Sequence, residues 1–275
     1  MFEDTPARQR LLSDETYLTT SYQPEKPVGR AAEIKHLAAA VRPITHRKSP
    51  ENLVLYGPAG VGKTTAVKHV FDRLEEETRV ATAFINCWQY STRSALLTEL
   101  LISLGYPAPR KGKPVDELLA KFREWLEKRD AGIVALDEFD QLKHLTRVVY
   151  DLRNASEQAK TAFGIVLLSN HSPSQIQLDD RSRSRLSYDT LEFTSYTSDD
   201  LVKILRQRVD HAFRRGTVTG EVLEVVADAV SEQGGDCRQA LNLLLRAGRT
   251  AENQRAKKVT VDHVEPLLES LSGGR

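Results

Sequence analysis

The chain has 275 residues, with 39 lysines and arginines against 38 aspartates and glutamates, a formal net charge of +1. This length allows one large domain or two modest ones, and it can bury a sizeable core without disulfides or metals. Hydrophobic residues make up 40% and charged residues 28%, which is typical of globular proteins and excludes a wholly disordered chain. The near-zero net charge excludes a protein that is basic throughout, so any contact with nucleic acid must come from a local patch.

The two cysteines, Cys87 and Cys237, lie far apart and belong to no CxxC pair or zinc-like Cys/His spacing. We therefore expect no zinc site but two buried or half-buried thiols in a reducing compartment. Residues 1–10 lack the apolar core of a secretory signal, and no apolar run approaches the roughly 18 residues of a membrane span. We expect a cytoplasmic or nucleoid-associated protein with no membrane partner.

The first 195 residues read as an α/β domain. Residues 1–30 are polar and broken by prolines, which predicts an irregular linker, and a short helix follows at Ala31–Val41. Short apolar runs then recur, which suits strands buried on both faces of a parallel sheet; they are Asn52–Tyr56, Val80–Asn86, Gly132–Leu136, Phe163–Ser169 and Thr190–Phe193. Amphipathic stretches between them predict helices at Thr65–Glu76, Arg93–Leu104 and Val115–Lys128. This alternation indicates right-handed crossovers and a doubly wound parallel sheet.

Residues 196–275 read as a small all-helical domain. After Tyr196 the strand pattern stops, and Ser198 is expected to cap a helix whose first turn holds Asp199 and Asp200. Further helices are predicted at Glu221–Glu232, Arg238–Gln254 and Val261–Leu271.

The strongest motif is the run GPAGVGKT at residues 57–64, a full G-x-x-x-x-G-K-[ST]. It lies after a predicted strand and before a predicted helix, where backbone N–H groups and the helix dipole can hold a phosphate. Lys63 is expected to contact the β- and γ-phosphates of ATP, or the β-phosphate of ADP, and Thr64 to place its hydroxyl on Mg²⁺. The nucleotide-contacting residues predicted here are Gly57, Pro58, Ala59, Gly60, Val61, Gly62, Lys63, Thr64 and Thr65.

Two carboxylates, Asp137 and Glu138, follow the apolar run Gly132–Leu136. Since ligands of open α/β sheets bind at the carboxyl ends of the strands, Asp137 can bind Mg²⁺ and Glu138 can act as general base on an attacking water. Asn170 follows the next strand in the same way. It either orients that water and touches the γ-phosphate, or only begins a turn; beside the other motifs we favour the catalytic role.

Arginines gather after the fourth predicted strand, at Arg181, Arg183 and Arg185. They form a solvated surface, a phosphate-binding patch, or an arginine finger given to a neighbouring subunit. Arg238 follows Gly234-Gly235-Asp236-Cys237 at the start of a predicted helix, where it either contacts the γ-phosphate or is an ordinary surface residue.

In this order, GPAGVGKTT, LDEFD, LLSN, RSRSRL and GGDCRQAL resemble Walker A, Walker B, sensor one, the arginine-finger box and sensor two of AAA+ ATPases. The details are similar to the archaeal and eukaryotic origin-recognition and Cdc-type replication initiators. The resemblance covers roughly residues 10–270, and the lid entry from Ser195 and the sensor-two segment are its more specific parts. It implies slow ATP hydrolysis by a nucleotide switch in DNA replication initiation, with other AAA+ subunits or replication proteins as partners.

The resemblance also implies residue roles. Arg185 would be the arginine finger, with Arg181 second, and Arg238 would be sensor two. Val28, Gly29, Tyr196 and Arg208 would line the nucleotide pocket. The segment Tyr90–Val115 stands where the family has a DNA-contacting helical insertion, unless it is a plain basic loop; its candidate DNA residues are Arg93, Arg110, Lys111 and Lys113.

The sequence departs from the family at two points. Phe139 stands where many relatives have a small residue, and the chain ends at Arg275 without residues for the winged-helix domain that usually follows the lid. We therefore expect weak DNA recognition by this chain alone, since affinity scales with the number of phosphate contacts. Two alternatives stay open: an ATP-dependent interaction module with little DNA binding, and a clamp-loader or helicase-loader ATPase.

Overall fold

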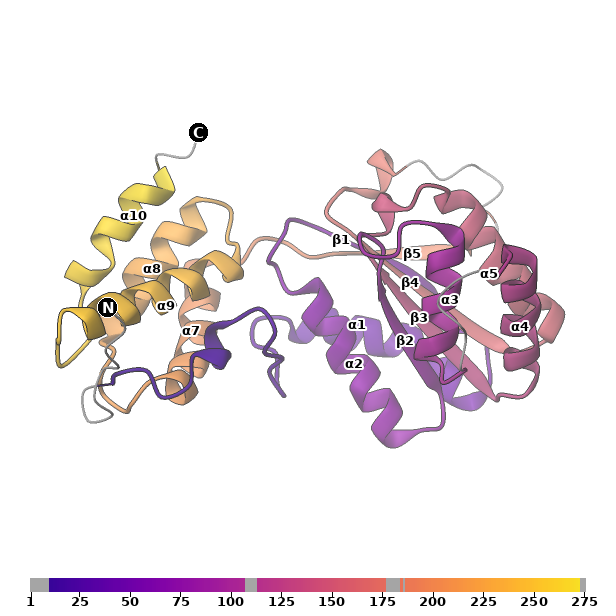
Figure 1. Cartoon of the computed structure of the whole chain (residues 1–275), viewed down its shortest axis with the longest axis horizontal. Helices are drawn as coiled ribbons and strands as arrows, with labels where there is room; N and C mark the ends of the chain where they lie inside the picture. Colours follow the sequence, from indigo (N-terminus) through magenta and orange to yellow (C-terminus); the bar gives the residue numbers. More distant parts are fainter. Residues whose placement is uncertain (1–9, 107–112, 177–183, 185, 273–275) are drawn as a thin grey trace. The chain divides into compact units, whose positions relative to one another are not determined.

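A parallel sheet forms the centre of the first of two compact units in the computed structural model, which describes residues 10–106, 113–176, 184 and 186–272. This α/β unit spans Arg30–Gly57 and Lys63–Phe193 (Figure 1). Its five described strands are β1 (Asn52–Tyr56), β2 (Ala81–Asn86), β3 (Ala131–Asp137), β4 (Ala162–Ser169) and β5 (Tyr188–Glu192). They lie in the order β2-β3-β4-β1-β5 and pair in parallel.

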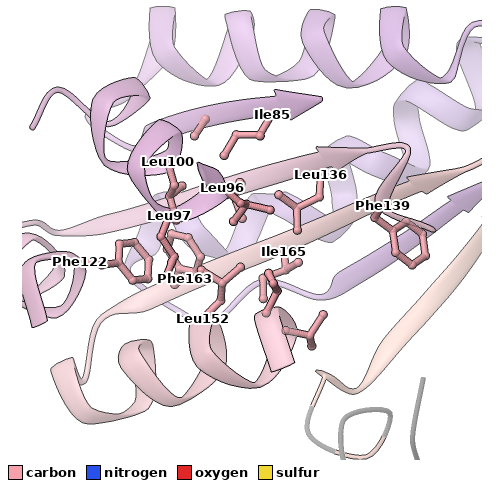
Figure 2. Close-up of a cluster of buried hydrophobic side chains, with 14 of the residues drawn as sticks. Ile85, Leu96, Leu97, Leu100, Phe122, Leu136, Phe139, Leu152, Phe163 and Ile165 are labelled. Carbon is pink, nitrogen blue, oxygen red and sulfur yellow. The ribbon is translucent and has the colours of Figure 1, made fainter. Parts of the chain in front are cut away.

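Helices cover both faces of this sheet (Figure 1). They are α1 (Ala31–Val41), α2 (Lys63–Glu77), α3 (Arg93–Ser103), α4 (Val115–Glu127) and α5 (Leu145–Ala159). The last three pack their apolar sides onto one face, where Figure 2 shows Leu96, Phe122 and Leu152 around the strand residues Leu136 and Ile165. Because side chains alternate along a strand, the neighbouring residues of β1 and β3 are buried on the opposite face, which α1 and α2 cover. Burial on both faces explains why these strands are nearly continuous apolar runs.

The second unit is helical and contains the described residues 10–29, 58–62 and 194–272. Its helices are α7 (Ser198–Ala212), α8 (Gly220–Glu232), α9 (Cys237–Asn253), the short 3-10 turn η6 (Val261–His263) and α10 (Glu265–Ser272). Their apolar stripes meet in one core, with Leu201, Leu205, Val226 and Leu244 each at most 1% exposed.

The N-terminal segment is part of the helical unit rather than the irregular linker we expected ahead of the α/β domain. Leu11, Leu12 and Leu18 are buried in the helical core. The carboxylate of Glu252 in α9 accepts hydrogen bonds from the backbone N–H groups of Leu11 (2.6 Å) and Leu12 (2.9 Å). The polar composition of this segment led us to expect a linker, although it contains three leucines that pack in the helical core. Helices α7 and α9 provide the surface against which the segment packs.

The doubly wound sheet followed by a helical domain is confirmed, and each predicted strand agrees with the structure to within two residues. Three local features differ from what the sequence predicted. Helix α5 was missed. Thr197, not Ser198, caps α7: its Oγ1 accepts from the N–H of Asp200, and the Asp200 carboxylate accepts from the N–H of Thr197. The last predicted helix is divided into η6 and α10.

Candidate nucleotide site

The phosphate loop begins at Gly57, which only glycine can occupy. Its φ of 143° lies in a region that L side chains rarely adopt. A Cβ there would lie 2.0 Å from the carbonyl oxygen of Phe193. This glycine lets the chain leave β1 closely packed against the residue that follows β5, and helix α2 then begins at Lys63.

The middle of the loop packs against the start of α9, within the helical unit. Gly60 has a φ of 72°, and a Cβ on it would lie 1.7 Å from Oδ1 of Asp236. The N–H of Cys237 donates to the carbonyl oxygen of Gly60 at 3.3 Å. Asp236 caps α9 by accepting from the N–H of Arg238, whose side chain is exposed. The loop and the proposed sensor-two arginine therefore belong to one local arrangement.

Lys63 and Asn170 lie side by side at the carboxyl edge of the sheet. The ammonium of Lys63 donates to the carbonyl oxygen of Gly57 at 2.7 Å and to Oδ1 of Asn170 at 2.9 Å. The lysine is only 7% exposed. The contact follows from topology, because β1 and β4 are neighbours and their ends are in register, with Tyr56 opposite Ser169.

Thr64 and Asp137 provide a pair of oxygen ligands. The hydroxyl of Thr64 donates to Oδ2 of Asp137 at 2.8 Å. Burial raises the pKa of Asp137 and the neighbouring charge of Glu138 raises it further, while the bond from Thr64 and the charge of Lys63 act in the opposite direction. Burial therefore disfavours the ionised carboxyl, and a bound cation would favour it.

Glu138 is held by a residue that the sequence analysis did not assign. Nδ2 of Asn86, the last residue of β2, donates to Oε2 of Glu138 at 3.2 Å, and its Oδ1 accepts from the N–H of Trp88 at 2.9 Å. Glu138 has a left-handed backbone, with φ 53°, and Phe139 after it is fully buried in the core. The large residue at position 139 thus anchors the turn that presents Glu138. The signal in the sequence was that Asn86 ends a strand, as Asp137 does.

A second unassigned pair supports Asn170. The hydroxyl of Ser169 is buried, donates to Oδ1 of Asp140 at 2.7 Å and accepts from the N–H of His171 at 2.9 Å. These bonds fix the backbone on both sides of Asn170. No local pattern pointed to them, since the two side chains are 29 residues apart.

Four predicted residues, Val28, Gly29, Tyr196 and Arg208, lie in the helical unit. A Cβ on Gly29 would lie 3.2 Å from the ring of Tyr196, which is buried. The guanidinium of Arg208 lies 4.4 Å from the ring centre of Tyr22, and its Nε and Nη1 are buried with no hydrogen-bond partner among the described residues. Burial lowers the pKa of Arg208. An arginine in this state has unused donors.

Two of the candidate DNA residues, Arg93 and Lys113, form ion pairs within the α/β unit. Arg93 donates from Nε (3.0 Å) and Nη2 (2.5 Å) to Asp151 on α5, a carboxylate that is 5% exposed. Lys113 forms an ion pair with Glu117 on α4. Arg93 is therefore committed to a structural ion pair. The remaining arginines and lysine named from the sequence lie outside the described residues; they are Arg110, Lys111, Arg181, Arg183 and Arg185.

Comparison with known proteins identifies the family. The model of the "AAA domain" matches residues 46–176, and the model of the "Cdc6 AAA+ ATPase-type lid domain" matches residues 202–266. The chain is 32% identical to ORC1-type DNA replication protein 1 of Archaeoglobus fulgidus, over 98% of this chain and 68% of the relative. It belongs to the family of ORC1-type DNA replication proteins. ORC1-type DNA replication protein 1 of Sulfurisphaera tokodaii is 33% identical, over 94% of this chain and 66% of the relative.

Solved structures agree with this assignment. The Aeropyrum pernix ORC1 protein in complex with DNA is 26% identical and superimposes with a TM-score of 0.85, over 98% of this chain and 71% of that one. Cdc6p of Pyrobaculum aerophilum has the same fold, with a TM-score of 0.83, over 93% of this chain and 70% of that one. This ORC1-type chain is thus an ATP-binding AAA+ protein of the replication-initiator type, and it spans about two thirds of the length of its curated relatives. Within its described residues, we find no helix with the length and hydropathy of a membrane span.

Proposed function

We propose that this chain binds ATP with Mg²⁺ and hydrolyses it slowly, as a nucleotide switch in replication initiation. One observation carries the proposal. Two contacts, Lys63 to Asn170 and Thr64 to Asp137, join three adjacent strand ends at the carboxyl edge of the sheet. The first residues of α2 therefore face both a polar amide and a buried carboxylate, which is the arrangement that a triphosphate and its metal require.

The residues fit a magnesium ion. Mg²⁺ prefers oxygen ligands and is usually held by one or two carboxylates together with substrate phosphates. Thr64 and Asp137 offer a hydroxyl and a carboxylate whose oxygens are 2.8 Å apart. Held by these two side chains, the ion would neutralise negative charge that develops on the phosphates. Lys63 would add a cation to the same phosphates by exchanging its contact with Asn170 for a phosphate oxygen.

Glu138 would accept a proton from the attacking water, and Asn86 would position the carboxylate of Glu138. The amide of Asn86 orients the Glu138 carboxylate, while the Ser169 to Asp140 bond holds Asn170 in place. Asn170 would then orient the γ-phosphate or the water. An amide donor on Glu138 restrains the general base, which supports slow rather than fast turnover.

The helical unit would supply further nucleotide contacts. We assign the α/β unit, together with residues 58–62 of the phosphate loop, to nucleotide binding, and residues 196–272 of the helical unit to the lid, with the N-terminal segment packed on the lid helices. The unused donors of Arg208 support its assignment to the nucleotide. We assign four further residues of this unit to the nucleotide as well: Val28, Gly29, Tyr196 and Arg238. Replacing Arg208 by methionine should then weaken ATP binding.

The central test separates binding from turnover. Lys63→Ala should abolish binding of a fluorescent ATP analogue, whereas Glu138→Gln should keep that binding and stop phosphate release. Lys68→Ala is the matched control, since Lys68 lies on the same helix with its ammonium 5.0 Å from the ring centre of Phe84. Hydrolysis at the wild-type rate in Glu138→Gln would contradict the assignment of the base.

The arginine finger is tested in an assembly. Arg185 is the first candidate and Arg181 the second. If Arg185 acts on the nucleotide of a neighbouring subunit, Arg185→Ala should lower the ATPase rate of the assembled protein while leaving ATP affinity nearly unchanged. An unchanged ATPase rate would show that Arg185 is not the arginine finger; the finger would then be Arg181 or a residue outside this segment.

We also propose that the chain binds duplex DNA. The proposal is supported by the 26% identical ORC1 protein, whose structure was determined in complex with DNA. Log affinity should fall linearly with log salt, and the slope should decrease when Arg110, Lys111 and Lys113 are changed to alanine. No binding at low salt would instead favour the ATP-dependent interaction module.

A further inference from the structure

A basic pocket opens at the edge of the α/β unit where β4 begins, opposite to the edge that holds Lys63 and Asn170. It has a volume of about 260 Å³ and is lined by Arg47, Ser49, Arg153, Glu157, Lys160 and Thr161, among others. It adjoins Ala162, the first residue of β4, whereas Asn170 follows the last residue, Ser169. A strand rises about 3.3 Å per residue, so the two ends of β4 are roughly 23 Å apart. The pocket is therefore separate from the nucleotide site.

The charges around this pocket are mostly positive. Three cations line it, and Glu157 is the carboxylate among its lining residues. Arg47 pairs outside the lining with Asp130 at 2.9 Å, but both side chains are at least half exposed, so water weakens the pair. Arg153 reaches Glu157 only at 4.0 Å. The cations keep an excess of positive charge that these carboxylates do not cancel.

Arg153 has one hydrogen-bond donor, its Nε, that no described acceptor meets. Its side chain is 20% exposed, yet its Nε is buried and has no hydrogen-bond partner among the described residues. A buried N–H that stays unpaired is costly, and native structures usually satisfy it with an ion or a water. An acceptor oxygen inside the pocket would meet this need.

Two of the three cations occupy left-handed backbone positions. Arg47 ends the 3-10 helix η3 (Arg42–His46) with a φ of 58°, and Lys160 ends α5 with a φ of 54°. Such positions favour glycine or asparagine, so a long charged residue there carries backbone strain. The partial negative charge at the end of α5 accounts for a cation at Lys160. It does not account for Arg47, which comes from a different segment.

We propose that this pocket is a binding site for a phosphate group. Two arginines and one lysine line it, and guanidinium groups match phosphate oxygens with paired donors. Its volume holds one tetrahedral oxyanion with some water, since liquid water occupies about 30 Å³ per molecule. The phosphate is either a free phosphate compound or a backbone phosphate of nucleic acid.

The left-handed backbone allows a clean test. Lys160→Gly and Arg47→Gly each remove a cation and relieve strain, so both variants should fold as the wild type does. Arg255→Gly is the matched control, because Arg255 also has a left-handed backbone, with φ 55°, but lies in the helical unit. The backbone amide signals of Thr161 and Ala162, followed by NMR in the ¹⁵N-labelled full chain, report on this pocket alone. The amides of the phosphate loop report separately, so a failure of ATP binding does not affect the result.

Inorganic phosphate should shift the signals of Thr161 and Ala162 in a saturable way that sodium chloride at equal ionic strength does not reproduce. The affinity should fall about tenfold in each of the two pocket variants and stay unchanged in Arg255→Gly. A short duplex DNA that shifts the same signals at lower concentration would identify the ligand as a backbone phosphate; a response to phosphate alone would identify a free phosphate compound. No saturable shift with either probe, or equal shifts in the pocket variants and the wild type, would overturn the proposal.

Discussion

Replacing Gly60 by alanine should destabilise the helical unit by about 2 kcal/mol. An L residue at its φ of 72° costs about 1 kcal/mol or more. The new Cβ would lie 1.7 Å from Oδ1 of Asp236, so that carboxylate must leave the N–H of Arg238, which it now caps at 2.8 Å. Loss of a helix cap costs about another 1 kcal/mol. The phosphate loop and the start of α9 are thus coupled sterically.

A double-mutant cycle measures this coupling. Gly216→Ala is the control in the same unit, because Gly216 also has a positive φ, of 76°, but nothing lies within 4 Å of its added Cβ. That control should cost only about 1 kcal/mol. Asp236→Gly removes the clashing carboxylate at a cost of a few tenths of a kcal/mol, about 0.3. In that background Gly60→Ala should cost no more than the control. Urea denaturation followed by circular dichroism gives all four values, and equal costs for Gly60→Ala in both backgrounds would refute the steric coupling.

Two further predictions concern buried charges. Asp137→Asn should raise the free energy of unfolding at pH 7, because burial raises the pKa of Asp137 and its ionised form therefore costs stability above that pKa. This gain in stability should shrink as the pH falls and the wild-type carboxyl becomes protonated. Equal gains by urea denaturation at pH 7 and pH 4.5 would contradict this reasoning. Arg93→Ala should cost about 3 kcal/mol, because among the described residues it leaves the buried carboxylate of Asp151 paired with the exposed Arg147 at 3.4 Å. Arg147→Ala should cost about 0.5 kcal/mol, and similar costs for the two would show that Arg93 is not the main partner.

Local patterns were sufficient for most of the fold. Strands β1, β3 and β4 are buried along nearly their whole length, so short apolar runs marked them to within two residues, and the glycine-rich loop marked the start of α2. Helix α5 was missed although Val148, Val149, Leu152 and Ala155 repeat at helical spacing. The cap of α7 was misplaced by one residue because Thr197 and Ser198 are both good caps, and only the bond to Asp200 distinguishes them.

The burial of the N-terminal segment and the ion-pair partner of Arg93 could be found only from the tertiary structure. The polar composition of residues 10–29 hides Leu11, Leu12 and Leu18, whose burial depends on helices more than 180 residues away in the chain. The sequence offered Arg93 either as a DNA contact or as part of a plain basic loop, since an arginine in a basic stretch gives no sign of its partner. The partner, Asp151, lies 58 residues further along and becomes visible only when α3 and α5 pack on the same face.

By itself the sequence determined the chemistry available to this ORC1-type chain: a phosphate loop, a carboxylate pair, a polar residue after the next strand, and the order in which they occur. The physical reason is that each motif is a short run whose residue types and spacing act within one turn or one strand end. The tertiary structure decided which of these groups meet. Lys63 reaches Asn170 across 107 residues and Thr64 reaches Asp137 across 73, because the strand order places β3, β4 and β1 next to one another. The same long-range packing added Asn86, Asp140 and Ser169 to the site and formed the basic pocket at the opposite edge, and no spacing along the chain encodes either.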